Sequence, residues 1–162
     1  MRCGATLAAI CAGCLSSGYL ERPLVATRPG VLIVCGSHTA AATAQLAVLV
    51  DKLGRQPVEV STDAALVDPV AAGRKAAAWL REQLRGYDVA VVSTERVRRP
   101  EHDSLAHGEL ITRALMTAAA EAAAEVGTVV SKGGITSAEV ARTALGATHA
   151  RVRGQLAAGI SV

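Results

Sequence analysis

Apolar runs alternate with longer amphipathic segments along most of this chain. Residues 31–35 are apolar throughout, and residues 88–93 and 128–131 form two further runs that are rich in Val. Continuous runs of this kind are typical of parallel β-strands that are buried on both faces of a sheet. A shorter run at residues 57–61 predicts one more strand near a sheet edge, and residues 149–153 are a candidate for another.

The segments between these runs have apolar residues at helical spacing. Asp68 and Pro69 form an N-cap and first-turn pair for one helix, and Gly54 ends the helix before it. We expect helices from the turn at residues 36–39 to Gly54, from Asp68 to Gly86, from Glu109 to Val126 and from Ser137 to Leu145.

This strand–helix alternation predicts the α/β class, with an open, mostly parallel sheet and helices on both faces, in a three-layer αβα arrangement. In such sheets, ligands bind outside the carboxyl ends of the strands, near a switch in strand order. The turns that follow the strands are therefore the first places to look for functional residues.

Composition excludes several classes of function. The 162 residues suffice for one domain with a real core, and aromatic residues make up only 2% of them. So few rings argue against stacking on single-stranded nucleic acid, and a net charge of +3 gives no strong field for polyanions. No apolar run approaches the roughly 20 residues that span a bilayer. We expect no nucleic-acid or membrane partner, and a cytoplasmic location.

Four cysteines are present, and three of them lie near the N-terminus. The small-residue run from Cys3 to Cys14 could be read as a short signal peptide, but its single Arg and its glycines favour an Ala-rich helix. Cys11 and Cys14 form one CxxC without the second pair that a zinc site needs, so we expect no metal site. Cys35 is expected to be a small core residue.

The first strand is followed by Gly36-Ser37-His38-Thr39. Glycine lets the backbone approach a ligand, and Ser37 and Thr39 place hydroxyls beside the free amides of a helix N-terminus, where an anion is stabilised. The alternative is that Ser37 or Thr39 only caps the helix. His38 could donate to an anion or be an ordinary turn histidine.

A second turn of this type follows residues 128–131 and reads Lys132-Gly133-Gly134-Ile135-Thr136-Ser137. Two successive glycines allow a nest of backbone amides that binds phosphate oxygens, and Lys132 adds a positive charge. Thr136 or Ser137 would cap the next helix. The alternative is a plain glycine turn with a cap. Neither turn has Walker spacing, but two such turns after central strands together predict a phosphate site.

Other polar residues are less informative. His102, His107 and His149 show no metal-ligand spacing and are treated as structural, and the cluster Arg96, Arg98 and Arg99 is read as a solvated loop with a weaker phosphate or substrate hypothesis. Phosphoryl transfer usually needs a positioning carboxylate and a metal-holding carboxylate. No pair stands out for these tasks, so the catalytic residues are left unassigned.

Residues 31–45 (VLIVCGSHTAAATAQ), 129–145 (VVSKGGITSAEVARTAL) and 153–160 (RGQLAAGI) resemble the C-terminal nucleotide-binding domain of the four-carbon acid sugar kinases, in the same order and with similar spacing. The resemblance implies ATP- and Mg²⁺-dependent phosphorylation of tetronates such as threonate or erythronate. It also implies that Ser37 and the turn of Gly133, Gly134, Ile135 and Thr136 contact the nucleotide. Together with Gly36 and Thr39 of the first turn, these residues form the predicted nucleotide site.

The chain departs from the family pattern at Ile135, Lys132 and Gln155, where the family has an acidic residue, Thr and Glu. The family's Asp-Asp-x-Thr-Gly motif for substrate and catalysis is not in the sequence. We therefore expect residues 1–30 to be a helix and linker left from a missing substrate domain, and residues 31–162 to be a nucleotide-binding domain truncated at its C-terminus. Alone, this chain is expected not to be a competent kinase.

Two other functions fit the same turns. One is a phosphosugar-binding domain of isomerase-like or regulatory type, since Gly-Ser-x-Thr turns also hold sugar phosphates. The other is a degenerate, non-catalytic interaction domain, dimeric through its Ala-rich helices. Homo-oligomerisation stays open in all three readings.

Overall fold

A computed structural model describes residues 10–11, 13, 18–21, 28–97, 99–102, 104–157 and 160–161. The chain divides into two compact units. One comprises Thr27–Thr148, and the other comprises Met1–Ala26 with His149–Val162. The larger unit contains the predicted phosphate turns and is described first.

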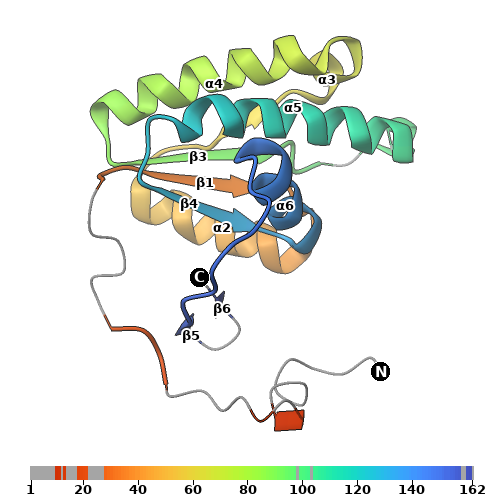
Figure 1. The fold of residues 1–162 in the computed structure, drawn as a ribbon. Helices are drawn as coiled ribbons and strands as arrows, with labels where there is room; N and C mark the ends of the chain where they lie inside the picture. Colours follow the sequence, from red (N-terminus) through yellow and green to blue (C-terminus); the bar gives the residue numbers. More distant parts are fainter. Residues whose placement is uncertain are drawn as a thin grey trace. The chain divides into compact units, whose positions relative to one another are not determined.

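The larger unit is built on a parallel sheet of four strands in the order β2-β3-β1-β4 (Figure 1). Cys35 pairs with both Ser93 and Lys132, so the central strand and its two neighbours end at the same level. The four strands predicted from the apolar runs are confirmed, with the shortest at an edge as expected. They are β1 (Val31–Cys35), β2 (Val58–Val60), β3 (Val89–Thr94) and β4 (Thr128–Lys132).

Helices cover both faces of this sheet, which confirms the predicted three-layer αβα class. α2 (Ala40–Leu53) lies on one face, and α4 (Pro69–Gly86) and α5 (Leu105–Ala123) lie side by side on the other (Figure 1). The expected caps are present: Asp68 accepts from the amides of the first turn of α4, and Gly54 ends α2 with a φ of 66°. Adjacent strands β1 and β3 thus lead into helices on opposite faces, which is the switch point where ligands bind.

Small side chains let α4 and α5 pack closely over the sheet. A Cβ atom on Gly73 of α4 would lie 2.5 Å from the carbonyl oxygen of Ala114 on α5. The sheet and helices bury a continuous apolar core between them. Its largest fully buried apolar side chains are Leu32, Val34, Val60, Leu80, Val92 and Leu115.

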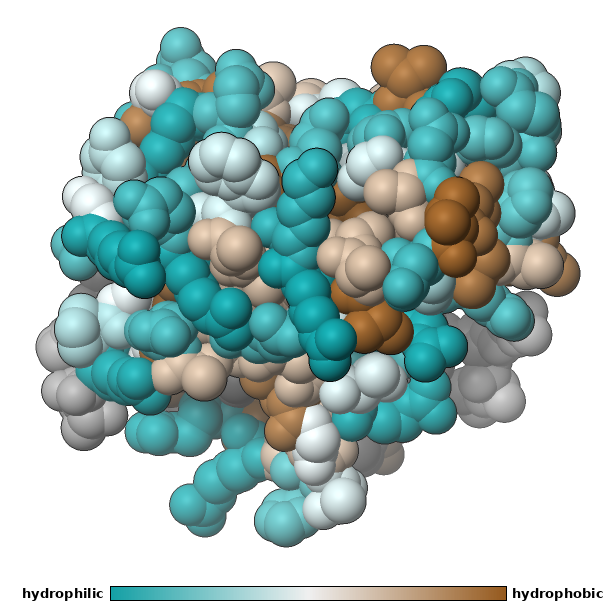
Figure 2. All heavy atoms as spheres, turned by 90° about the horizontal axis from the view of Figure 1, so that it is seen from above, coloured by the Kyte–Doolittle hydropathy of each residue, from teal (hydrophilic) through white to brown (hydrophobic). Residues whose placement is uncertain are grey.

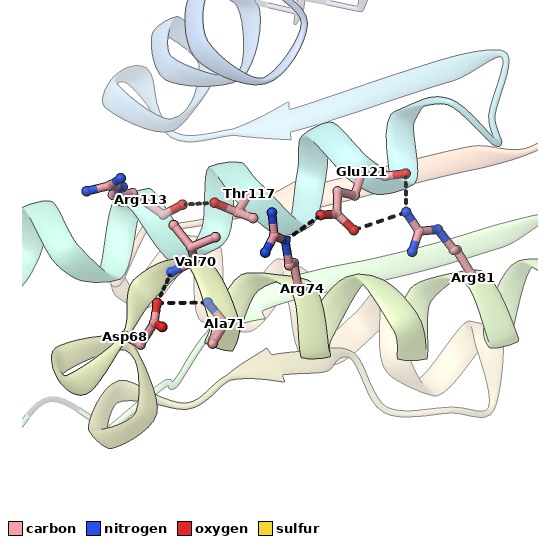
Figure 3. A network of polar contacts seen from close by, with 8 residues as sticks. All are labelled: Asp68, Val70, Ala71, Arg74, Arg81, Arg113, Thr117 and Glu121. Carbon is pink, nitrogen blue, oxygen red and sulfur yellow. Dashed lines mark hydrogen bonds and ion pairs between the residues drawn. The ribbon is translucent and has the colours of Figure 1, made fainter.

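The polar side of the same helix pair is held by one carboxylate. Glu121 of α5 lies between Arg74 and Arg81 of α4, with ion pairs of 3.3 and 3.1 Å (Figure 3). These partly exposed pairs link the two helices but add little stability individually. The surface seen from this side is largely hydrophilic, with separate hydrophobic patches (Figure 2).

One helix of the larger unit was not predicted, and two of the predicted helix starts are wrong. Helix α3 (Thr62–Val67) was not predicted and is capped by Ser61. Helix α5 starts before the predicted Glu109, because the Ser104 hydroxyl accepts from the amide of His107 and caps it there. His107 is therefore in a helix and not in a loop.

The last helix of the larger unit also starts early. Helix α6 (Gly134–Glu139) begins directly after the second glycine turn and continues into the π-helical turn η2 (Val140–Ala144). The predicted start at Ser137 is wrong because Gly133, with a φ of 110°, already occupies the N-cap position. A short 3-10 turn, η1 (Pro100–His102), precedes α5.

In the smaller unit, β5 (Gln155–Ala157) pairs antiparallel with β6 (Ile160–Ser161). Residues 149–153 form no strand, contrary to the prediction, because pairing begins only after Gly154, at Gln155. The predicted helix from Cys3 to Cys14 lies mostly outside the described residues, although Ile10 and Cys11 are helical and the Cys11 thiol is free. Within the described part of the chain, no helix is both long and apolar enough to cross a membrane.

Candidate functional site

The two glycine turns lie against each other because β1 and β4 are neighbours in the sheet. A Cβ atom on Gly36 would lie 2.5 Å from the Oγ1 atom of Thr136, and one on Gly133 would lie 3.0 Å from the Cβ atom of Ser37. Side chains at either glycine would push the turns apart. Glycine is thus required at both positions for this close approach.

A cavity of about 530 Å³ opens at this end of the sheet. Its walls come from both turns, from the residues after β2 and β3, and from one face of α5. The structure brings all seven predicted phosphate-site residues to this one cavity, while their role in binding stays a prediction. They are Gly36, Ser37, Thr39, Gly133, Gly134, Ile135 and Thr136.

In the first turn, the two hydroxyls have different tasks. The Oγ1 atom of Thr39 accepts from the amide of Ala42 at 3.2 Å and caps α2, as the simpler of the two interpretations proposed. The hydroxyl of Ser37 lies 3.2 Å from that of Thr39 and accepts from the amide of Thr39 at 3.5 Å, but it caps no helical amide. Ser37 is therefore the hydroxyl of this turn that is available to a ligand.

In the second turn, the predicted cap by Thr136 or Ser137 is wrong. The helix begins at Gly134, so its N-cap is Gly133, which has no side chain for capping. Thr136 is buried in the first turn of α6 and faces Gly36, and the Ser137 hydroxyl bonds to that of Ser131 at 2.9 Å. Lys132 is exposed and does not line the cavity.

His38 and Arg96 connect the first turn to the end of β3. The Nε2 atom of His38 lies 2.9 Å from the carbonyl oxygen of Glu95 and 3.2 Å from the Thr94 hydroxyl. The guanidinium of Arg96 donates to the carbonyl oxygen of Ser37. The cluster at residues 96–99 is thus not simply a solvated loop, because Arg96 bonds to the Ser37 turn and Arg99 pairs with Asp63 and Glu95. Arg98 lies outside the described residues.

The opposite wall carries charged residues that sequence reasoning did not assign. Glu95 accepts from the amide of Thr62 at 3.0 Å and pairs with Arg99 at 3.4 Å, and Arg99 also pairs with Asp63 at 3.0 Å. The hydrogen bond to Asp63 raises the pKa of Arg99 above its ordinary value, against an opposing effect of desolvation. The position of Glu95 directly after a strand was a usable signal, because strand ends meet at this edge.

The histidines near this wall do not form a metal centre. The rings of His102 and His107 lie edge to face with centroids 5.7 Å apart, and the Nδ1 atom of His102 is 4.0 Å from Asp63. Among the residues that the structure describes, no group of three or more His, Cys, Asp or Glu could hold a metal ion.

Fold and site together define an α/β ligand-binding domain whose cavity lies at the switch point of a parallel sheet, between two glycine turns. The model of the nucleotide-binding C-terminal domain family matches residues 32–162, and the chain belongs to this family. The membership supports a nucleotide-binding role. A search of the curated proteins and a search of the solved structures each found no match.

Proposed function

We propose that this chain binds ATP and is the nucleotide-binding domain of a kinase that phosphorylates four-carbon acid sugars of the threonate or erythronate type. The observation that carries the proposal is the contact between the Gly36–Thr39 and Gly133–Thr136 turns around one cavity. These turns also carry the resemblance to that kinase family, and the domain family matched here is found in sugar-acid kinase-like proteins.

The residues at the cavity fit a nucleoside polyphosphate. The two closely approaching turns give phosphate oxygens access to backbone and to the Ser37 hydroxyl. Ile111, Leu115 and Met116 add an apolar wall, and the volume lies within the range of small-molecule sites. When bound, ATP supplies the phosphoryl group to be transferred, while these residues orient it and exclude water.

Magnesium would enter with the nucleotide. Mg²⁺ keeps several waters and is usually held by one or two carboxylates together with substrate phosphates, so it does not need a preformed cluster of protein ligands. Glu95 is a carboxylate among the described residues of the cavity wall and would be a protein partner for it, in exchange for part of its bonding to Thr62 and Arg99.

The resemblance assigns the sugar acid to a different domain of such kinases. We therefore propose that phosphoryl transfer requires that domain, and that this chain alone binds nucleotide without turnover. The ATP supply of the cytoplasm is the setting in which this reaction would run.

Thermal unfolding with and without ligand tests the proposal. The ligands are Mg-ATP, Mg-ADP and a panel of sugar phosphates. A ligand at about 100 times its Kd adds about 2.7 kcal/mol, which raises Tm by about 5–10 °C for a domain of this size. A nucleotide-selective shift supports the proposal. A shift with sugar phosphates alone favours a phosphosugar-binding domain instead, and no shift with any ligand rejects both.

A serine pair gives a matched control. Ser37→Ala removes the hydroxyl at the cavity that caps no helical amide and should reduce the nucleotide shift. Ser137→Ala makes the same change at the last residue of the second turn, where the hydroxyl bonds to Ser131 and does not line the cavity. Equal effects of the two substitutions would reject the site assignment.

A further inference from the structure

Arg96 lies in the loop after β3 and reaches back to the first glycine turn. Its Nη2 atom donates to the carbonyl oxygen of Ser37 and, at 3.0 Å, to the hydroxyl of Thr43 in the first helical turns of α2. These two bonds tie the end of β3 to the turn after β1. The backbone of Ser37 is thereby fixed from outside its own turn.

Apart from these two bonds, the guanidinium of Arg96 has no polar partner in the described parts of the chain. Its Nε and Nη1 atoms are shielded from solvent and have no hydrogen-bond partner there, and no carboxylate forms an ion pair with it. Arg99 shows the usual solution, because it pairs with Asp63 and Glu95. Arg55 has the same two nitrogens shielded and without a partner, but its guanidinium lies 3.7 Å over the ring of Tyr87, whereas Arg96 has no such ring contact among the residues that the structure describes. A shielded charge that is only partly hydrogen-bonded and has no ion-pair partner is unfavourable, and an anion nearby relieves it.

We propose that Arg96 is a positioning residue whose charge is compensated by the phosphates of the bound ligand. It does not line the cavity. It therefore acts by holding the Ser37 turn and by its electric field, without touching the ligand. The inference rests on the proposed function only in that a phosphate-bearing ligand binds at this turn.

Titration calorimetry with ligands of increasing charge tests this role. The ligands are AMP, ADP, ATP and inorganic tripolyphosphate, and the proteins are the wild type, Arg96→Gln, Arg96→Lys and Arg74→Gln. Arg74 is an exposed arginine of α4, so its variant removes the same formal charge away from the site. Arg96→Gln should lose roughly tenfold in ATP affinity, with a smaller loss for ADP and the smallest for AMP, because the lost attraction scales with ligand charge.

Arg96→Lys should prefer ATP over AMP by the same factor in affinity as the wild type. Lysine keeps the positive charge, although it lacks the planar guanidinium group. Arg74→Gln should behave like the wild type. An equal loss for all three nucleotides in Arg96→Gln would mean a purely structural role and would overturn the proposal. If Arg96→Gln does not fold, the test rests on Arg96→Lys. A smaller ratio of ATP affinity to AMP affinity in that variant than in the wild type counts against the proposal.

Two results for the wild type separate this inference from the proposed function. If the wild type binds tripolyphosphate as tightly as it binds ATP, the ATP site is rejected. The role of Arg96 is then tested by comparing the affinities of the wild type and the Arg96 variants for tripolyphosphate. Binding of none of the four ligands would reject both proposals.

Discussion

Gly36 and Thr136 are far apart in the sequence, yet the Thr136 hydroxyl occupies the space that a side chain at position 36 would need, 2.5 Å from an ideal Cβ atom. Gly36 follows β1 and Thr136 lies in the first turn of α6 after β4. The spacing of these two turns therefore depends on the absence of a side chain at Gly36 and on the buried Thr136.

Gly36→Ala should weaken nucleotide binding and destabilise the fold. The new methyl group would overlap Thr136 and approach Leu115 to 3.1 Å, and overpacking of this kind costs about 1–3 kcal/mol. Thr136→Ala removes the overlapping atoms, so the double variant should be more stable than the sum of the single effects, with a coupling of about 0.5–3 kcal/mol. Urea unfolding of the four proteins measures this coupling. Strict additivity would mean that the turns are not in contact.

Gly86→Ala is the control for this substitution. Gly86 ends α4, its added Cβ atom would meet nothing within 4 Å, and it lies away from the cavity. Its replacement should leave ligand affinity unchanged and alter stability by less than about 1 kcal/mol.

Gly133→Ala should impair the site through backbone strain. Gly133 has a φ of 110°, which L side chains rarely adopt, and its Cβ atom would lie 3.0 Å from that of Ser37. Strained conformations of this kind cost about 1–3 kcal/mol, so the turn should relax to another conformation and lose affinity. Calorimetric titration with ATP and with tripolyphosphate should show a loss for both ligands, because the backbone is common to them. Wild-type affinity for both ligands would contradict the assignment of this turn to the binding site.

Glu95→Gln should loosen helix α3 from the sheet. The carboxylate accepts from the Thr62 amide and pairs with Arg99, and the neutral amide keeps at most part of these bonds. A charge-assisted bond of a partly exposed group contributes about 1 kcal/mol after screening. Hydrogen exchange of the α3 amides should therefore become several times faster, whereas Glu59→Gln, on the exposed side of β2, should have no such effect. Unchanged exchange in both variants would show that Glu95 does not hold α3.

Much of the fold could be predicted because its signals are local. Apolar runs marked the four strands, and Asp68-Pro69 and Gly54 marked helix ends through their own backbone preferences. The two glycine turns were also found locally. Their contact was not, because it depends on the pairing of β1 with β4, which no residue pattern within one turn specifies.

The parts that were missed depend on tertiary contacts. Helix α3 is only six residues long, too short for a periodic pattern, and it is held by a carboxylate from the end of the neighbouring strand β3. The inward direction of Arg96 is set by the carbonyl oxygen of Ser37, and that acceptor becomes available only when β1 and β3 are adjacent. Charged residues in a loop look alike in sequence whether they face solvent or a neighbouring turn.

Gly73→Ala should destabilise the protein without changing the site. Alanine is the better helix former by about 1 kcal/mol, so an isolated α4 would gain from the change. In the folded chain, however, the added Cβ atom would lie 2.5 Å from the Ala114 carbonyl oxygen and from the Thr117 Cβ atom, and backbone cannot move aside cheaply. The steric overlap should outweigh the gain in helix propensity. Urea unfolding should show a free energy of unfolding lower by about 1–3 kcal/mol and an unchanged m-value. ATP affinity should stay at the wild-type value because the helix crossing does not line the cavity. A more stable Gly73→Ala variant would mean that α4 and α5 are less closely packed than this structure has them.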